Sequence, residues 1–134
     1  MKEEKTADFA SMSTQDLLIA LYERAIRDLE EAKKAKDDKE ESVFAGKLDH
    51  FDRIVLQLCS MLDRSQEIST NLYRLYEFLH YEVGELLAKK ADYAKEIPAM
   101  IGIVTNLRDG FRGAEEQLQN GGSEKSGSKG AEQL

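Results

Sequence analysis

Apolar residues recur at alternating spacings of three and four along most of this chain, and that period limits the fold more than any other feature. It begins over residues 13–29 and continues through three longer segments. Their seam residues are Phe44, Leu48, Phe51, Val55, Leu58 and Leu62, then Ile68, Leu72, Leu75, Leu79, Val83 and Leu86, then Met100, Val104, Leu107, Phe111, Ala114 and Leu118. No segment alternates with period two, as a half-buried strand would. The sequence therefore predicts an all-α protein.

Polar residues and the single proline indicate where these helices begin. The hydroxyl of Ser13 can accept from the backbone N–H of Asp16, which predicts the start of the first helix. We expect Asp37 or Asp38 to cap the second helix. Pro98 lacks a backbone donor, so it is expected in the first turn of the fourth helix or at a kink after a short 3₁₀ piece.

The connections between the four segments are short, with the third helix expected over about residues 66–89. Helices joined by short loops pack as antiparallel neighbours. The sequence thus predicts an antiparallel up-down four-helix bundle over residues 13–119. Residues 1–12 show no sustained period and are predicted to form a flexible arm. Residues 120–134, NGGSEKSGSKGAEQL, are too polar to bury and are predicted to be a disordered tail.

Charge and composition narrow the class of protein. The formal net charge is −7, which argues against nucleic acid as a partner because phosphate binding needs a basic face. No apolar run is long enough to span a membrane, and the arm has no signal-peptide core, so we expect a cytoplasmic protein without membrane insertion. The single cysteine, Cys59, fits a reducing compartment.

A search for catalytic patterns yields two incomplete ones. Glu77 and His80 match the Glu-x-x-His pair of di-iron bundles, but that site needs a second pair and two more inward carboxylates. His50 with Arg53 one turn later is a partial version of a histidine-phosphotransfer site. No glycine-rich phosphate loop or nucleophile triad is recognisable. We therefore predict no enzyme activity and no cofactor, with a histidine-phosphotransfer or metal-binding bundle as the alternative.

The remaining signal is apolar surface beyond what one core needs. The first helix has two apolar stripes. We assign one of them to the core, namely Leu17, Leu18, Leu21, Ala25 and Leu29, which leaves a second stripe beside it. A second set accompanies the seam of the third helix, and the fourth helix has a widened face. A soluble monomer rarely leaves such a patch uncovered, so these residues are expected to bind a partner. The predicted partner-binding residues are Ile19, Tyr22, Ile26, Tyr73, Tyr76, His80 and Ile101.

Four stretches together carry a family resemblance. They are STQDLLIALYERAIRDLEEAK, LQLCSMLD, EISTNLYRLYEFL and IGIVTNLRDGF, which occur in this order between about Ser13 and Phe111. This pattern resembles the flagellin-specific export chaperones of the FliS family. The chain differs from the usual family pattern at Ser65 and Gln66, where a Gly-Gly pair is usual, and at Phe111, where a Trp is usual.

The resemblance implies a cytoplasmic chaperone without enzyme activity. Such a protein holds the disordered C-terminal segment of flagellin, prevents its premature polymerisation and delivers it for export. The implied partners are the flagellin segment and proteins of the export apparatus. A helical surface with apolar grooves is physically suited to an amphipathic segment that orders as it binds.

Overall fold

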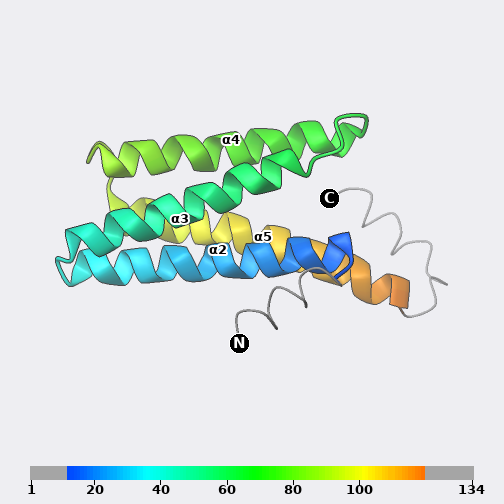
Figure 1. The fold of residues 1–134 in the computed structure, drawn as a ribbon, viewed down its shortest axis with the longest axis horizontal. Helices are drawn as coiled ribbons and strands as arrows, with labels where there is room; N and C mark the ends of the chain where they lie inside the picture. Colours follow the sequence, from blue (N-terminus) through cyan, green and yellow to red (C-terminus); the bar gives the residue numbers. More distant parts are fainter. Residues whose placement is uncertain (1–11, 120–134) are drawn as a thin grey trace.

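The computed structural model describes residues 12–119, and within them it contains four α-helices and no strand. The helices are α2 (Thr14–Asp37), α3 (Glu41–Ser60), α4 (Glu67–Leu87) and α5 (Tyr93–Gln119). They run alternately in opposite directions and are joined by short connections (Figure 1). The predicted four-helix bundle is confirmed. The predicted tail and all but the last residue of the predicted arm lie outside the described residues.

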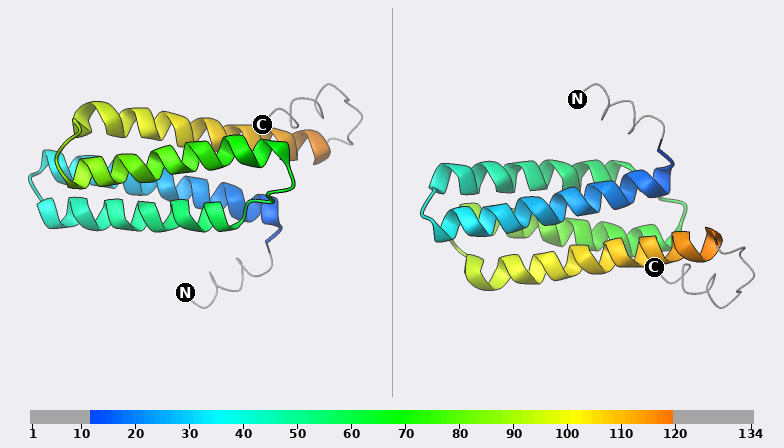
Figure 2. Two further views of the ribbon diagram at one scale, coloured as in Figure 1. Left: turned by 90° about the horizontal axis from the view of Figure 1, so that it is seen from above. Right: turned by 90° about the horizontal axis from the view of Figure 1, so that it is seen from below.

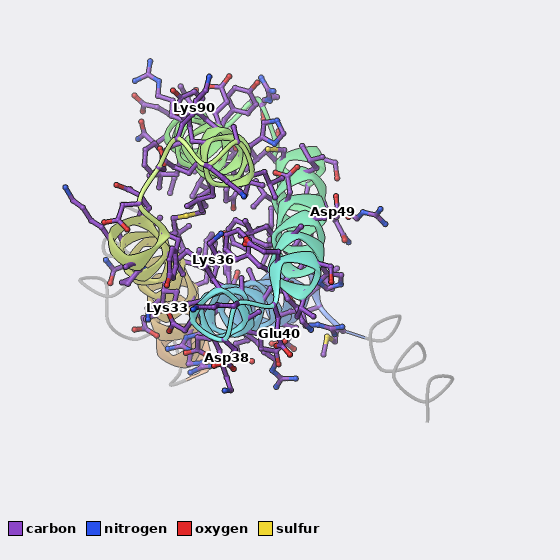
Figure 3. The ribbon with its side chains drawn as sticks, turned by 90° about the vertical axis from the view of Figure 1, so that its left-hand side faces the viewer. Lys33, Lys36, Asp38, Glu40, Asp49 and Lys90 are labelled. Carbon is purple, nitrogen blue, oxygen red and sulfur yellow. The ribbon has the colours of Figure 1, made fainter. Side chains whose placement is uncertain are left out.

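The four helices occupy the corners of a square in the order α5, α2, α3, α4. Helix α2 packs most extensively, against α3 on one side and α5 on the other, and α4 packs on α3 (Figure 2). Of the adjacent pairs, helices α4 and α5 approach each other least closely. Figure 3 views the bundle from the end where α2 connects to α3 and α4 to α5, and α2 and α4 lie at opposite corners. Any direct contact between α2 and α4 is therefore diagonal, through the core.

The ends of the helices agree only in part with the sequence prediction. Ser13 caps α2 as expected, because its Oγ accepts from the backbone N–H of Asp16 at 3.1 Å. The expected Asp37 or Asp38 cap of α3 is wrong. Asp37 is the last residue of α2 and Asp38 its C-cap, while Glu40 is the N-cap of α3 and makes no side-chain capping bond.

Helix α2 continues to Asp37 because a Schellman motif ends it there. The Glu40 N–H donates to the Ala35 carbonyl at 2.8 Å, and the Lys39 N–H donates to the Lys36 carbonyl at 3.0 Å. Lys39 has a φ of 61°, the left-handed conformation that this motif requires. The same pattern ends α4, where Lys89 also has a φ of 61°.

The position of Pro98 differs from both of the positions that we expected. It lies inside one continuous helix, α5, rather than in the first turn or at a 3₁₀ kink. Its position is the sixth of that helix, so the only helical bond it removes is the one its own nitrogen would have given to Ala94. Pro98 is also exposed, so its ring meets solvent rather than a neighbouring helix.

The seams of α3, α4 and α5 form the core much as predicted. Buried residues from all four helices make one contiguous cluster, with Leu48, Phe51, Leu79 and Met100 among those exposed by at most 1%. Leu75 and Leu107 are half-buried at its edge. Two tyrosines, Tyr22 and Tyr76, are the largest fully buried side chains.

Candidate functional site

The stripe predicted to lie outside the core of α2 is part of the core, together with Ala25 and Leu29, which were assigned to it. Tyr22 has no exposed surface, and Ile19 and Ile26 are each only 8% exposed. Leu17 and Leu21, which were assigned to the core, are half-buried instead. The expectation that Ile19, Tyr22 and Ile26 lie on the surface is therefore wrong, because the bundle covers their side chains.

Small residues lie on the side of α2 that faces into the bundle. Ala25 and Ala32 are buried seven residues apart, in register with Leu18, and Ala35 is also buried. Alanine allows the backbones of packed helices to approach closely, and here α2 packs between two neighbours. Tyr22 and Leu29 are likewise seven residues apart, so the face between the alanines and the isoleucines points into the bundle.

Tyr76 is also a core residue, and it explains how Tyr22 can be buried. The hydroxyl oxygens of Tyr22 and Tyr76 lie 2.5 Å apart, in a hydrogen bond that crosses the bundle from α2 to α4. The ring of Tyr22 also stacks on Phe111, with centroids 5.8 Å apart. Burial raises the pKa of Tyr22 to about 12 and raises that of Tyr76 further. The prediction that Tyr76 lies beside the core is wrong for the same reason as for Tyr22.

The other three predicted residues keep exposed surface, in separate places. Tyr73 on α4 is half-buried beneath the guanidinium of Arg64, whose central carbon lies 4.5 Å from the ring centroid. His80 on α4 is exposed, and its Nδ1 lies 2.6 Å from a carboxylate oxygen of Asp52 on α3. Ile101 on α5 is half-buried against the core. Their role in partner binding stays a prediction.

The exposed apolar surface is concentrated on the outer face of α4, which the sequence interpretation missed. Of the six large hydrophobic residues that are exposed in the described part of the chain, three lie on α4: Phe78 at 42%, Tyr81 at 60% and Leu87 at 44%. They line an open groove of about 950 Å³ together with His80 and Gly84. We call this surface the α4 groove. Asp52, Arg74, Glu77 and Glu85 form its charged rim.

A second apolar hollow lies at the end of the bundle where the described chain begins and ends. This end cavity has a volume of about 330 Å³ and is lined by all four helices and the connection between α3 and α4. Leu18, Leu62, Ile68 and Phe111 are half-buried in its wall, and the buried Tyr76 lines it as well. Its lining and size suit one or two apolar side chains of a partner.

Both histidines of the chain pair with an aspartate of the preceding helix. His50 Nδ1 on α3 lies 2.5 Å from Asp28 Oδ2 on α2, and the Asp28 side chain is only 4% exposed. His80 makes the corresponding contact with Asp52. Over residues 12–119, no group of three or more His, Cys, Asp or Glu side chains could hold a metal ion. Each of these His–Asp contacts joins two neighbouring helices of the bundle.

Cys59 is half-buried beside the core, and burial raises the pKa of its thiol. A thiol with a raised pKa carries little thiolate at neutral pH and is a poor nucleophile.

Within the described residues, no helix has the combination of length and apolar character needed to cross a membrane.

Comparison with known proteins agrees with the resemblance carried by the four sequence stretches. A sequence model of the protein family described as flagellar protein FliS matches residues 1–118, almost the whole chain. No curated protein sequence matches the chain significantly. The family match covers the bundle except for the last residue of α5.

Proposed function

The chain belongs to the FliS family of flagellar proteins, a family of chaperones, and from this premise we propose that it binds the C-terminal segment of flagellin in the cytoplasm. Binding would keep that segment from polymerising before export and would deliver it, still unfolded, to the export apparatus. The activity needs no bond-making step and no cofactor. It needs a surface that holds an amphipathic segment reversibly.

The observation that carries this proposal is the exposed apolar face of α4. A soluble helix normally presents polar residues on the side away from its core, yet Phe78, Tyr81 and Leu87 are all at least 42% exposed there. Aromatic side chains are frequent anchors of protein interfaces because they bury a large area with few rotatable bonds. We therefore place the client on the α4 groove, with His80 at its edge.

The end cavity supplies a deeper anchoring point for the same client. Its half-buried leucine, isoleucine and phenylalanine side chains can pack around an inserted apolar side chain without a change of backbone. Tyr73 and Ile101, which keep exposed atoms, extend the proposed surface along α4 and α5. A client that wraps around the bundle can occupy several such positions weakly, which suits a complex that must release.

The test is a calorimetric titration of a flagellin C-terminal peptide into the Phe78→Ala/Tyr81→Ala variant. Interface anchors typically cost about 1–4 kcal/mol each when truncated, so affinity should fall at least about tenfold. The matched control is Leu56→Ala on α3, which removes an equally exposed apolar side chain at 50% exposure. Melting curves should be unchanged in both variants. Wild-type affinity in the α4 variant would refute this placement.

A further inference from the structure

A second groove, between α2 and α3, differs in chemistry from the surfaces described above. It consists of two adjoining hollows of about 560 and 360 Å³ that share Arg24, Arg27 and His50. Gly46, Lys47 and the 43% exposed Val43 line it from α3. We call this surface the α2/α3 groove. Helices α2 and α3 lie side by side along its length (Figures 1 and 2).

The arginines of this groove have no acidic partner among the described side chains. The three lysines near the C-terminal end of α2 all pair with a nearby carboxylate: Lys33 with Asp37, Lys34 with Asp38 and Lys36 with Glu41. Arg24 and Arg27 lie on the same helix, are exposed and make no such pair. In a chain of net charge −7, two adjacent unpaired arginines are unusual and mark a locally positive surface.

The acidic residues of the groove offset only part of this charge, because Glu31 and Glu23 already pair with Lys47 and Arg112. The Asp28 carboxylate is bound by His50, and Glu31 pairs with Lys47 at 2.8 Å. The hydrogen bond from Lys47, followed by the charges of Lys47, Arg27 and Arg24, holds the pKa of Glu31 below its usual value. The two arginines thus leave an excess of positive charge at the groove, since Asp28 is the one carboxylate of its lining without a lysine or arginine partner.

Gly46 lines the groove, and packing within the chain does not explain why this residue is a glycine. It lies in the interior of α3, where glycine costs about 1 kcal/mol relative to alanine. A Cβ atom built on it would meet nothing within 4 Å. Packing inside the chain therefore does not require glycine at this position. Close approach of a second backbone along α3 would require it.

We propose that the α2/α3 groove is a docking surface for an acidic peptide segment of a partner protein, separate from the proposed client surface. Arginine binds carboxylates through two parallel hydrogen bonds, so Arg24 and Arg27 suit two acidic side chains one helical turn apart. Val43 offers an apolar contact on α3 beyond Lys47, and the partner backbone passes over Gly46. A chaperone with two such surfaces can hold its client and a second protein together.

An acidic peptide fits these features better than a nucleic acid does. Two unpaired cations offset few phosphates, and nucleic-acid affinity depends on many such contacts. The net charge of the chain also repels a long polyanion while tolerating a short segment with a few carboxylates. Val43 has no role in phosphate binding.

The first test uses the full-length chain and labelled helical peptides followed by fluorescence anisotropy. The probe carries Glu and Leu at helical spacing, and matched peptides carry Gln or Lys in place of each Glu. The Glu peptide should bind about tenfold more tightly than either, and this difference should shrink at about 0.5 M salt. The variant Arg24→Gln/Arg27→Gln should lose about fivefold in affinity. Lys33→Gln/Lys34→Gln removes the same charge from the same helix and should bind as the wild type does.

A second pair of variants tests the groove by its shape. Gly46→Leu fills it, and because leucine favours helix more than glycine does, the melting temperature should stay or rise while binding is lost. Gly102→Leu on α5 is the control, since Gly102 is also an exposed helical glycine with open space around it. It should leave peptide binding unchanged.

Three results would overturn the proposal. The first is equal binding of the Glu and Gln peptides, and the second is unchanged affinity in the double arginine variant. The third is arginine-dependent binding of a short single-stranded DNA in preference to the Glu peptide, which would make the groove a nucleic-acid site. None of these measurements includes flagellin, so failure here leaves the proposed client function standing. In a further titration, the flagellin peptide should not displace the Glu peptide. Displacement would mean that the two peptides bind the same surface.

Discussion

The buried tyrosine pair permits a sharp test of how this core is held together. Replacing Tyr22 with Phe removes one hydroxyl and leaves that of Tyr76, which is 1% exposed, without its partner. A buried polar group that loses its hydrogen bond costs about 1–3 kcal/mol, so each single variant should lose that much stability. The double variant removes both hydroxyls and leaves no orphan, so it should lie within about 1 kcal/mol of the wild type.

The measurement is a double-mutant cycle by urea denaturation of Tyr22→Phe, Tyr76→Phe and the double variant. The summed losses of the two single variants should exceed the loss in the double variant, by a coupling energy of at least about 1 kcal/mol. In thermal melts each kcal/mol corresponds to about 4 °C for a domain of this size. Tyr81→Phe, at a side chain that is 60% exposed, should stay within about 0.5 kcal/mol. Additive single effects would mean that the two hydroxyls do not depend on each other, which would refute the diagonal bond.

Further predictions follow from the same structure. Raising the pH from 10 to 11 should destabilise the wild type by about 2 kcal/mol more than Tyr22→Phe/Tyr76→Phe, because the unfolded tyrosines ionise near 10 while the folded pKa of Tyr22 is about 12 and that of Tyr76 higher. This stability is complete below pH 10 and is lost as the pH rises toward the folded pKa; parallel pH profiles for the two proteins would contradict it. Lys39→Gly and Lys89→Gly should each stabilise by about 0.5–1 kcal/mol in urea titrations, since both positions have a φ of 61°. Lys39→Ala, which keeps a Cβ, should give no such gain, and an equal gain would rule out backbone strain as the cause.

The architecture could be predicted from the sequence because it depends on period alone. The spacing of Phe44, Leu48, Phe51 and Val55 identifies a buried face whatever that face packs against, and all four are buried. The ends of helices were less predictable. Glycine is the usual residue at the left-handed position of a Schellman motif. Here Lys39 occupies it, so the sequence contained no glycine after Asp38 to mark the end of α2.

The site was mispredicted for a different reason, which concerns the treatment of tyrosine. Tyr76 lies four residues after Leu72 and three before Leu79, so its spacing alone places it on the buried face. Its hydroxyl argued for an edge position, because a buried hydroxyl needs a partner and one helix cannot show where that partner is. The partner is Tyr22, which lies 54 residues away in the chain and diagonally across the bundle. Only the tertiary structure brings the two together.

The two faces of α4 provide a final prediction from adjacent residues. Leu79 is 1% exposed and Phe78 is 42% exposed, so neighbouring positions face the core and the proposed client. Leu79→Ala should cost about 2–5 kcal/mol of stability through the cavity it leaves, and it should reduce flagellin affinity only as far as it unfolds the chain. Phe78→Ala should leave the melting curve nearly unchanged and weaken the peptide several-fold. Paired calorimetric melts and titrations of the two variants distinguish these effects. If Phe78→Ala destabilised the bundle as much as Leu79→Ala did, the outer aromatic face would belong to the fold, and the apolar surface of α4 would no longer call for a partner.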